Sequence, residues 1–163
     1  MFKSVSKPAL SVTSVVLGLV VAVAAFSGDA RAAGDTEVGH AEAASTKLET
    51  DSFLVEITPI GTYKAGVAGS VKVSLTTKGV FHINGEYPYR FKMAKPADGV
   101  AYPKPVVERS DGEFAEKTAV FKLPFVPAHS GTFVVGGVFH MSVCSPTSCV
   151  VQKAPLDISV SVL

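Results

Sequence analysis

The sequence has little of several features that define large classes of proteins. Its 163 residues include no tryptophan and only two cysteines, and 15 basic residues nearly balance 14 acidic ones. Two cysteines are too few for a disulfide-rich miniprotein or a four-thiolate zinc module. A formal charge of +1 without a basic stripe argues against a nucleic-acid partner. No window has a sustained 3.6-residue apolar stripe, which argues against a helical fold.

Sequence motifs of common enzymes are also missing. The chain contains no G-x-S-x-G, no H-E-x-x-H and no glycine-rich phosphate loop. These motifs position a nucleophilic serine, a zinc ion and a nucleotide, respectively. We therefore expect no cofactor or metal ion, and the sequence leaves open whether the protein is an enzyme.

The first 32 residues have the layout of a secretory signal peptide. Lys3 and Lys7 precede an uncharged, mostly apolar run from Ala9 to Phe26, and Ala30-Arg31-Ala32 follows as an A-x-A pattern. This layout predicts cleavage after Ala32 and favours a bacterial exporter. An uncleaved anchor is the alternative, because the run approaches the length that spans a bilayer. Cleavage would give a periplasmic or secreted protein without a membrane segment, in a compartment that permits disulfides.

The remainder divides into a linker and one domain. Residues 33–50 are rich in Ala, Gly, Glu, Ser and Thr and contain no aromatic residue, which is typical of a flexible linker. From residue 51 the pattern changes to period two with many β-branched residues. Strands are predicted at residues 53–58, 70–76, 87–93, 116–123, 132–143, 149–152 and 156–163. The pattern predicts one antiparallel immunoglobulin-like β-sandwich of about seven or eight strands over residues 51–163, with a barrel as the alternative.

The two cysteines flank a short predicted hairpin loop. Ser-Pro-Thr-Ser separates Cys144 from Cys149, and this composition suits a turn between two strands. The two cysteines would then face each other at a distance close to disulfide reach. Closing such a short loop stabilises a domain by only about 2 kcal/mol, so the bond would be a weak staple. Exposed short-loop disulfides are also the more reducible ones.

Spacing alone leaves three interpretations of the cysteine pair open. The pair is a structural clip, a redox-active centre, or a soft metal site with His140 and, less readily, Met141. On a strand His140 shares a face with Cys144 while Met141 points to the other face. His140 lies four residues from Cys144, so we expect no direct contact between them. His82 precedes a strand and is interpreted as a structural histidine, and His129 lies in a predicted turn.

Several landmarks in order resemble one family. They are VKVSL at 71–75, EYPYRFKM at 86–93, DGV at 98–100, FKLPF at 121–125, GTFVV at 131–135, the Cys144/Cys149 hairpin, and APLDI at 154–158. Together they resemble the N-terminal domain of the thiol:disulfide interchange protein DsbD, over about residues 70–163. That family has an immunoglobulin-like fold with a redox cysteine pair on a hairpin. Its loop between the cysteines is one residue longer and carries acidic and aromatic residues that this chain lacks.

The resemblance implies a role for particular residues. Cys144 and Cys149 would accept electrons from a thioredoxin-like domain and pass them to periplasmic oxidoreductases. A cap loop covers the pair in that family, and its nearest counterpart here is residues 104–114, with Glu108, Asp111, Glu113 and Phe114. The sequence therefore predicts a periplasmic thiol-disulfide exchange module. The alternative is a non-enzymatic immunoglobulin-like binding or structural domain with a permanent hairpin disulfide.

Overall fold

The computed structural model describes residues 45–163, which form eleven strands and one 3₁₀ turn. The elements are β1 (Lys47–Glu49), β2 (Phe53–Pro59), β3 (Gly69–Thr77), β4 (His82–Ile83), β5 (Arg90–Met93), β6 (Val100–Ala101), β7 (Val106–Glu108), η1 (Arg109–Asp111), β8 (Glu113–Phe114), β9 (Thr118–Pro127), β10 (Gly131–Cys144) and β11 (Cys149–Val162). Within these residues no helix is long and apolar enough to cross a membrane. The predicted signal peptide and residues 33–44 of the predicted linker lie outside the described residues.

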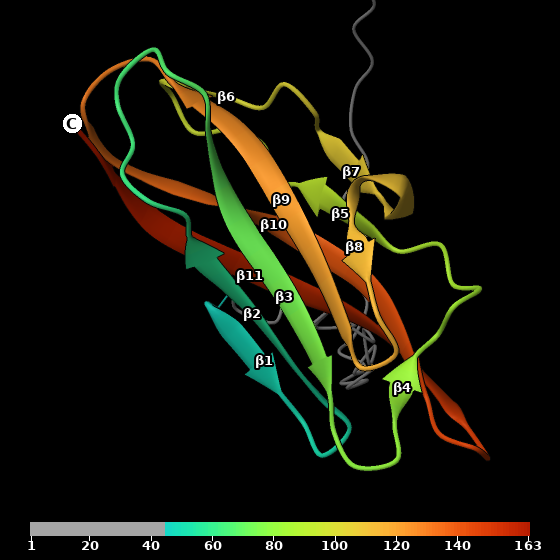
Figure 1. The fold of residues 1–163 in the computed structure, drawn as a ribbon. Coiled ribbons are helices and arrows are strands. Elements are labelled where there is room, and N and C mark those ends of the chain that lie inside the picture. The colour runs from blue at the N-terminus through green and yellow to red at the C-terminus, as the bar shows by residue number, and fades with distance from the viewer. Residues whose placement is uncertain (1–44) are drawn as a thin grey trace, which may run out of the picture. The chain divides into compact units, whose positions relative to one another are not determined.

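The strands form two antiparallel sheets that pack face to face (Figure 1). The six-stranded sheet has the order β1-β2-β3-β9-β6, and β8 pairs with β9 as well. The five-stranded sheet has the order β11-β10-β5-β7, and β4 pairs with β10 as well. This arrangement confirms the predicted all-β antiparallel sandwich, immunoglobulin-like in the broad sense. Two separate sheets exclude the closed barrel for the described residues.

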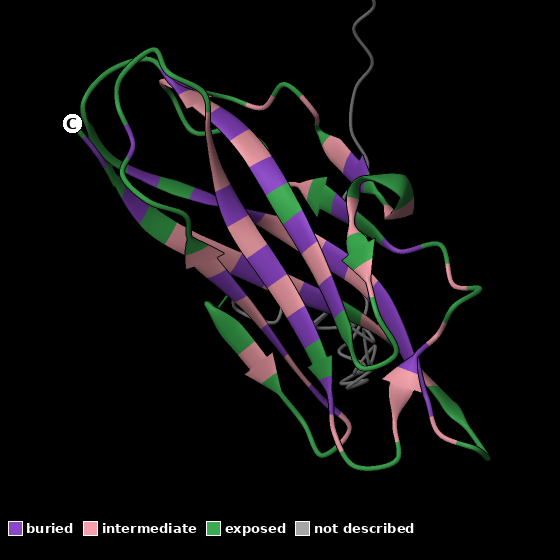
Figure 2. Ribbon diagram, in the orientation of Figure 1, coloured by how far each residue is buried: buried purple, intermediate pink, exposed green. Residues whose placement is uncertain are grey.

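The core lies between the sheets and follows the period of two in the sequence. Figure 2 shows buried residues alternating with intermediate or exposed ones along β2, β3 and β9. On β2, Phe53, Val55 and Ile57 are buried and alternate with partly exposed residues. Aromatic rings fill the centre, where Phe139 of β10 contacts Phe121 of β9 with ring centroids 5.2 Å apart. This contact joins the two sheets directly.

The structure has more strands than the sequence predicted, and they begin earlier. Five of the eleven strands (β1, β4, β6, β7 and β8) contain only two or three residues. Such segments are too short for an alternating pattern to reveal them. Residues 45–50, which the sequence analysis assigned to the linker, carry β1 and pair with β2.

The last strand is continuous, although the sequence analysis divided it at Pro155. β11 pairs with β10 from Cys149 to Val162 without interruption. A proline is tolerated there because β11 is the edge strand of its sheet and needs ladder hydrogen bonds on only one side.

Paired glycines within a strand often mark a bulge or a bend, but the β10–β11 register runs through Gly136 and Gly137 without a step, so there is no bulge here. Close approach of neighbouring strands explains the two glycines instead. A Cβ atom on Gly136 would collide with the backbone of β11, and one on Gly137 with the backbone of β5. The glycines therefore allow three strands to approach closely.

Candidate functional site

The two cysteines lie at the end of one hairpin. β10 ends at Cys144, β11 begins at Cys149, and the register pairs the two residues directly. In the loop, the backbone N–H of Ser145 donates to the carbonyl oxygen of Ser148 at 2.7 Å. The Oγ of Ser145 accepts hydrogen bonds from the backbone N–H groups of Thr147 (3.3 Å) and Ser148 (3.1 Å). The predicted four-residue hairpin loop is confirmed, and the Ser145 side chain holds its shape.

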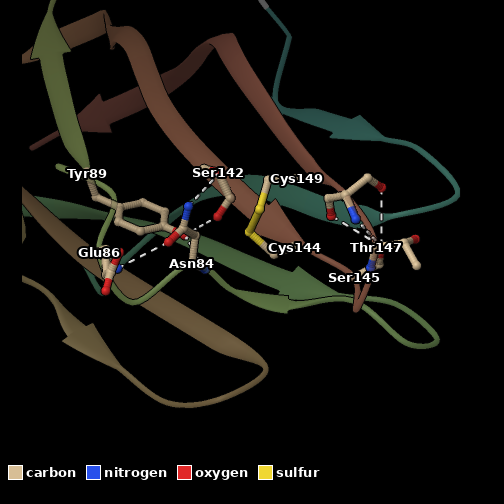
Figure 3. The surroundings of a disulfide bond; sticks show 9 residues. Asn84, Glu86, Tyr89, Ser142, Cys144, Ser145, Thr147 and Cys149 are labelled. Carbon is tan, nitrogen blue, oxygen red and sulfur yellow. Dashed lines mark hydrogen bonds between the residues drawn. A yellow bond between two sulfur atoms is a disulfide. The ribbon is translucent and has the colours of Figure 1, made fainter.

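Cys144 and Cys149 form a disulfide with their Cα atoms 4.0 Å apart (Figure 3). The two residues differ strongly in access to solvent. Cys144 is only 7% exposed, whereas Cys149 belongs to the exposed residues of β11. A thiolate that attacks a disulfide must reach the sulfur that it binds. The difference in residue exposure therefore favours Cys149 as the member of the pair that a partner thiolate attacks.

A hydrogen-bonded turn is anchored beside Cys144 (Figure 3). Asn84 follows β4, and its side-chain Nδ2 donates to the Oγ of the fully buried Ser142 at 3.2 Å. Its backbone N–H donates to the carbonyl oxygen of Ser142 (3.2 Å) and to the hydroxyl of Tyr89 (3.1 Å). The Tyr89 hydroxyl in turn donates to the Ser142 carbonyl oxygen. Burial raises the pKa of Tyr89, so the phenol stays protonated and can donate.

Replacing Tyr89 with phenylalanine tests how much this hydrogen-bond network contributes to the free energy of unfolding. Tyr89→Phe removes one donor and one acceptor next to a buried carbonyl and should lower the free energy of unfolding by about 1–2 kcal/mol. Urea unfolding measures this loss. Tyr87→Phe is the matched control, because within residues 45–163 the Tyr87 hydroxyl forms no hydrogen bond. Equal losses in the two variants would contradict the network.

His82, which the sequence indicated to be a structural histidine, lies beside the disulfide. His82 of β4 pairs directly with Cys144 of β10, on the side opposite Cys149. Side chains of directly paired residues share a face and have Cβ atoms about 4.5–5.5 Å apart. His82, Cys144 and Cys149 therefore form one row across three strands. An imidazolium ion so close to a cysteine stabilises the thiolate.

His140 and Met141 do not join the cysteines. His140 shares the face of Cys144, as predicted, but lies four residues along β10, which corresponds to about 13 Å in a strand. Met141 is fully buried in the core, on the opposite face of the sheet. The ligand set considered for a soft metal ion is therefore not brought together by the fold.

The counterpart of the cap loop is held by contacts of its own. Asp111 accepts a hydrogen bond from the backbone N–H of Glu108 and forms a salt bridge with Lys104. The hydrogen bond from Lys104 is the main cause that lowers the pKa of Asp111. Phe114 packs against Tyr89, with ring centroids 5.1 Å apart. These pairings link residues 104–114 to the cysteines only indirectly, through Tyr89 and Ser142.

Comparison of the chain with models of known protein families and with curated proteins found no match.

Proposed function

We propose that this domain exchanges disulfides with thiol proteins through Cys144 and Cys149. The observation that carries the proposal is the asymmetry of the pair: Cys149 is an exposed residue at the start of the edge strand β11, and Cys144 is a buried residue of β10. An exposed member gives a partner access to the bond, and a buried member is kept close to resolve the mixed disulfide. A permanent clip would not need this difference in exposure.

The reaction starts with an oxidised domain and a reduced partner dithiol. A partner thiolate attacks the Sγ of Cys149, the bond between the two cysteines breaks, and Cys144 leaves as a thiolate. The second partner thiolate then attacks the partner sulfur of the mixed disulfide and releases Cys149 as a thiolate. The partner is oxidised to a disulfide, and the domain gains two electrons. His82 would stabilise the Cys144 thiolate while it is the leaving group.

The reduced domain would pass these electrons on by the reverse chemistry. Cys149 attacks the disulfide of the next protein, and Cys144 closes on Cys149 to release that protein in its reduced form. The resemblance to the DsbD N-terminal domain supports thioredoxin-like oxidoreductases as partners, and the signal-peptide pattern supports the periplasm as the location. The class of partner and the periplasmic location are both part of the proposal.

Mixing the oxidised domain with reduced thioredoxin tests the transfer. We expect two new thiols to appear in the domain, which a maleimide mass-shift assay counts after acid quenching. His82→Gln should slow this reduction several-fold, because the leaving thiolate loses the imidazole beside it. His129→Gln is the control, since His129 is an exposed turn residue whose ring packs on Phe133, remote from the hairpin in sequence. A domain that stays oxidised with excess reduced thioredoxin would indicate a permanent clip.

A further inference from the structure

A hollow of about 600 Å³ lies on the outer face of the five-stranded sheet, around Gly136 of β10. We call it the Gly136 hollow. Most of its lining is apolar and comes from three segments of the chain, with Met93, Tyr102, Val134, Val138 and Pro155 among the side chains. Val134 is 50% exposed there. This volume falls within the range of pockets that hold small organic ligands.

The hollow has a positively charged end. His140 lines it, and the registers place Arg90 of β5 and Lys153 of β11 directly on either side of His140. Lys92, two residues farther along β5, also lines the hollow. Burial, followed by the charges of Arg90, Lys92 and Lys153, lowers the pKa of His140. Cations of β5 and β11 therefore flank the His140 side chain of β10 and disfavour its protonation.

Among the described residues Arg90, Lys92 and Lys153 form no salt bridge, although Glu108 of β7 is paired directly with Arg90 in the register. The salt bridges within residues 45–163 involve other lysines and none of Arg90, Lys92 or Lys153. Two further charged residues line the hollow, Lys95 after β5 and Asp157 on β11. Asp157 pairs with Gly136 in the register, four residues along β11 from Lys153, so it lies away from the His140 end. The positive end is thus open to a negative charge supplied by a ligand.

We propose that the Gly136 hollow binds an apolar carboxylate, with the hydrocarbon part over Val134, Gly136 and Val138 and the carboxylate beside His140, Lys92 and Lys153. The charge complementarity of one end and the apolar lining of the rest together select this class. A neutral hydrocarbon would leave the cations without a partner, and a small polar anion would leave the apolar lining exposed. This site uses neither cysteine, so it is independent of the proposed thiol-disulfide exchange.

Decanoate, used below its micelle-forming concentration, is a suitable probe. In NMR titrations of the ¹⁵N-labelled protein, we expect saturable shifts at Val134, Gly136 and His140. Affinity should rise about fourfold per buried methylene from hexanoate to decanoate, corresponding to about 0.8 kcal/mol each. The His140 pKa should rise when decanoate is bound, because a nearby anion favours the imidazolium. Decyltrimethylammonium, with the same chain and the opposite charge, should bind much more weakly.

Two pairs of variants separate the charged end from the apolar part. Lys92→Gln with Lys153→Gln should weaken decanoate binding several-fold, whereas Lys72→Gln with Lys122→Gln should leave it unchanged. Lys72 and Lys122 lie on neighbouring strands of the other sheet, where they are directly paired. Val134→Asp should abolish binding, whereas Val151→Asp should not. Val151 is 61% exposed on the same sheet and does not line the hollow.

Two results would overturn the proposal. Equal binding of decanoate and decyltrimethylammonium would show that the hollow adsorbs any hydrocarbon chain. Absence of saturable decanoate shifts in the folded protein would show that the hollow is not a carboxylate site. If, in addition, neutralising Lys92 and Lys153 weakened the reaction with thioredoxin, the cations would belong to a protein-docking surface. A variant with both cysteines changed to serine should bind decanoate normally, so failure of the exchange function does not affect this test.

Discussion

A Cys144→Ser variant is expected to accumulate a mixed disulfide with a thioredoxin-fold partner, and a Cys149→Ser variant is expected to accumulate little. The Cys144→Ser variant keeps the exposed thiol and loses the thiol that would resolve the complex. The Cys149→Ser variant keeps only Cys144, a residue that is 7% exposed in the oxidised domain. A partner thiol reaches it poorly, so most of the trapped complex should come from the first variant.

The trapping experiment needs a partner that also lacks its resolving cysteine. Non-reducing electrophoresis then separates the covalent complex from the free proteins, and mass spectrometry identifies the joined cysteines. The variant with both cysteines replaced is the control and should form no complex. Equal trapping by the two single variants would show that exposure does not select the attacking sulfur. Failure of both would contradict the proposed exchange function.

Replacing Phe139 with alanine should lower the free energy of unfolding by about 3–5 kcal/mol, the largest effect on stability that we predict. Phe139 is fully buried, and its ring centroid lies 5.2 Å from that of Phe121 and 6.2 Å from those of Tyr89 and Phe91. Truncation leaves a cavity where the two sheets meet. The midpoint of thermal unfolding should fall by about 10–20 °C.

The control for this substitution is Val134→Ala on the same strand. Val134 points to the outer face and is 50% exposed, so its truncation should change the unfolding free energy by less than about 0.5 kcal/mol. Calorimetry or denaturant unfolding measures both variants. A small loss in Phe139→Ala would mean that the two sheets do not depend on this aromatic contact.

Local features of the fold could be predicted because their causes are local. The hairpin between Cys144 and Cys149 follows from four loop residues and the strand pattern on either side. The buried face of β2 follows from alternation over seven residues. In both cases the residues that decide the structure are neighbours in the sequence, so their pattern carries the information.

The surroundings of the disulfide could not be predicted in the same way. His82 lies beside Cys144 only because β4, a strand of two residues, pairs with the end of β10. Tyr89 reaches Ser142 across a separation of 53 residues. Such contacts depend on the pairing of distant strands, and no local pattern in the sequence encodes that pairing. The exposure difference between Cys144 and Cys149 is likewise visible only after folding.

The contacts of the cap-loop residues could not be predicted from the sequence either. The resemblance suggested that Glu108, Asp111, Glu113 and Phe114 would lie over the cysteine pair. In the structure Asp111 is paired with Lys104, and Phe114 contributes its ring to the cluster around Tyr89. The order of the landmarks along the chain identified residues 104–114 as the counterpart of the cap loop. The packing of the folded domain decides which groups these residues contact.

The reduction potential of the Cys144–Cys149 pair tests the central claim most directly. The protein would be equilibrated in glutathione or dithiothreitol buffers of known potential, and its free thiols would be counted by alkylation. Disulfide exchange predicts a potential between about −120 and −270 mV, the range of dedicated oxidoreductases. A value well below about −300 mV would identify a structural disulfide and contradict the proposed function.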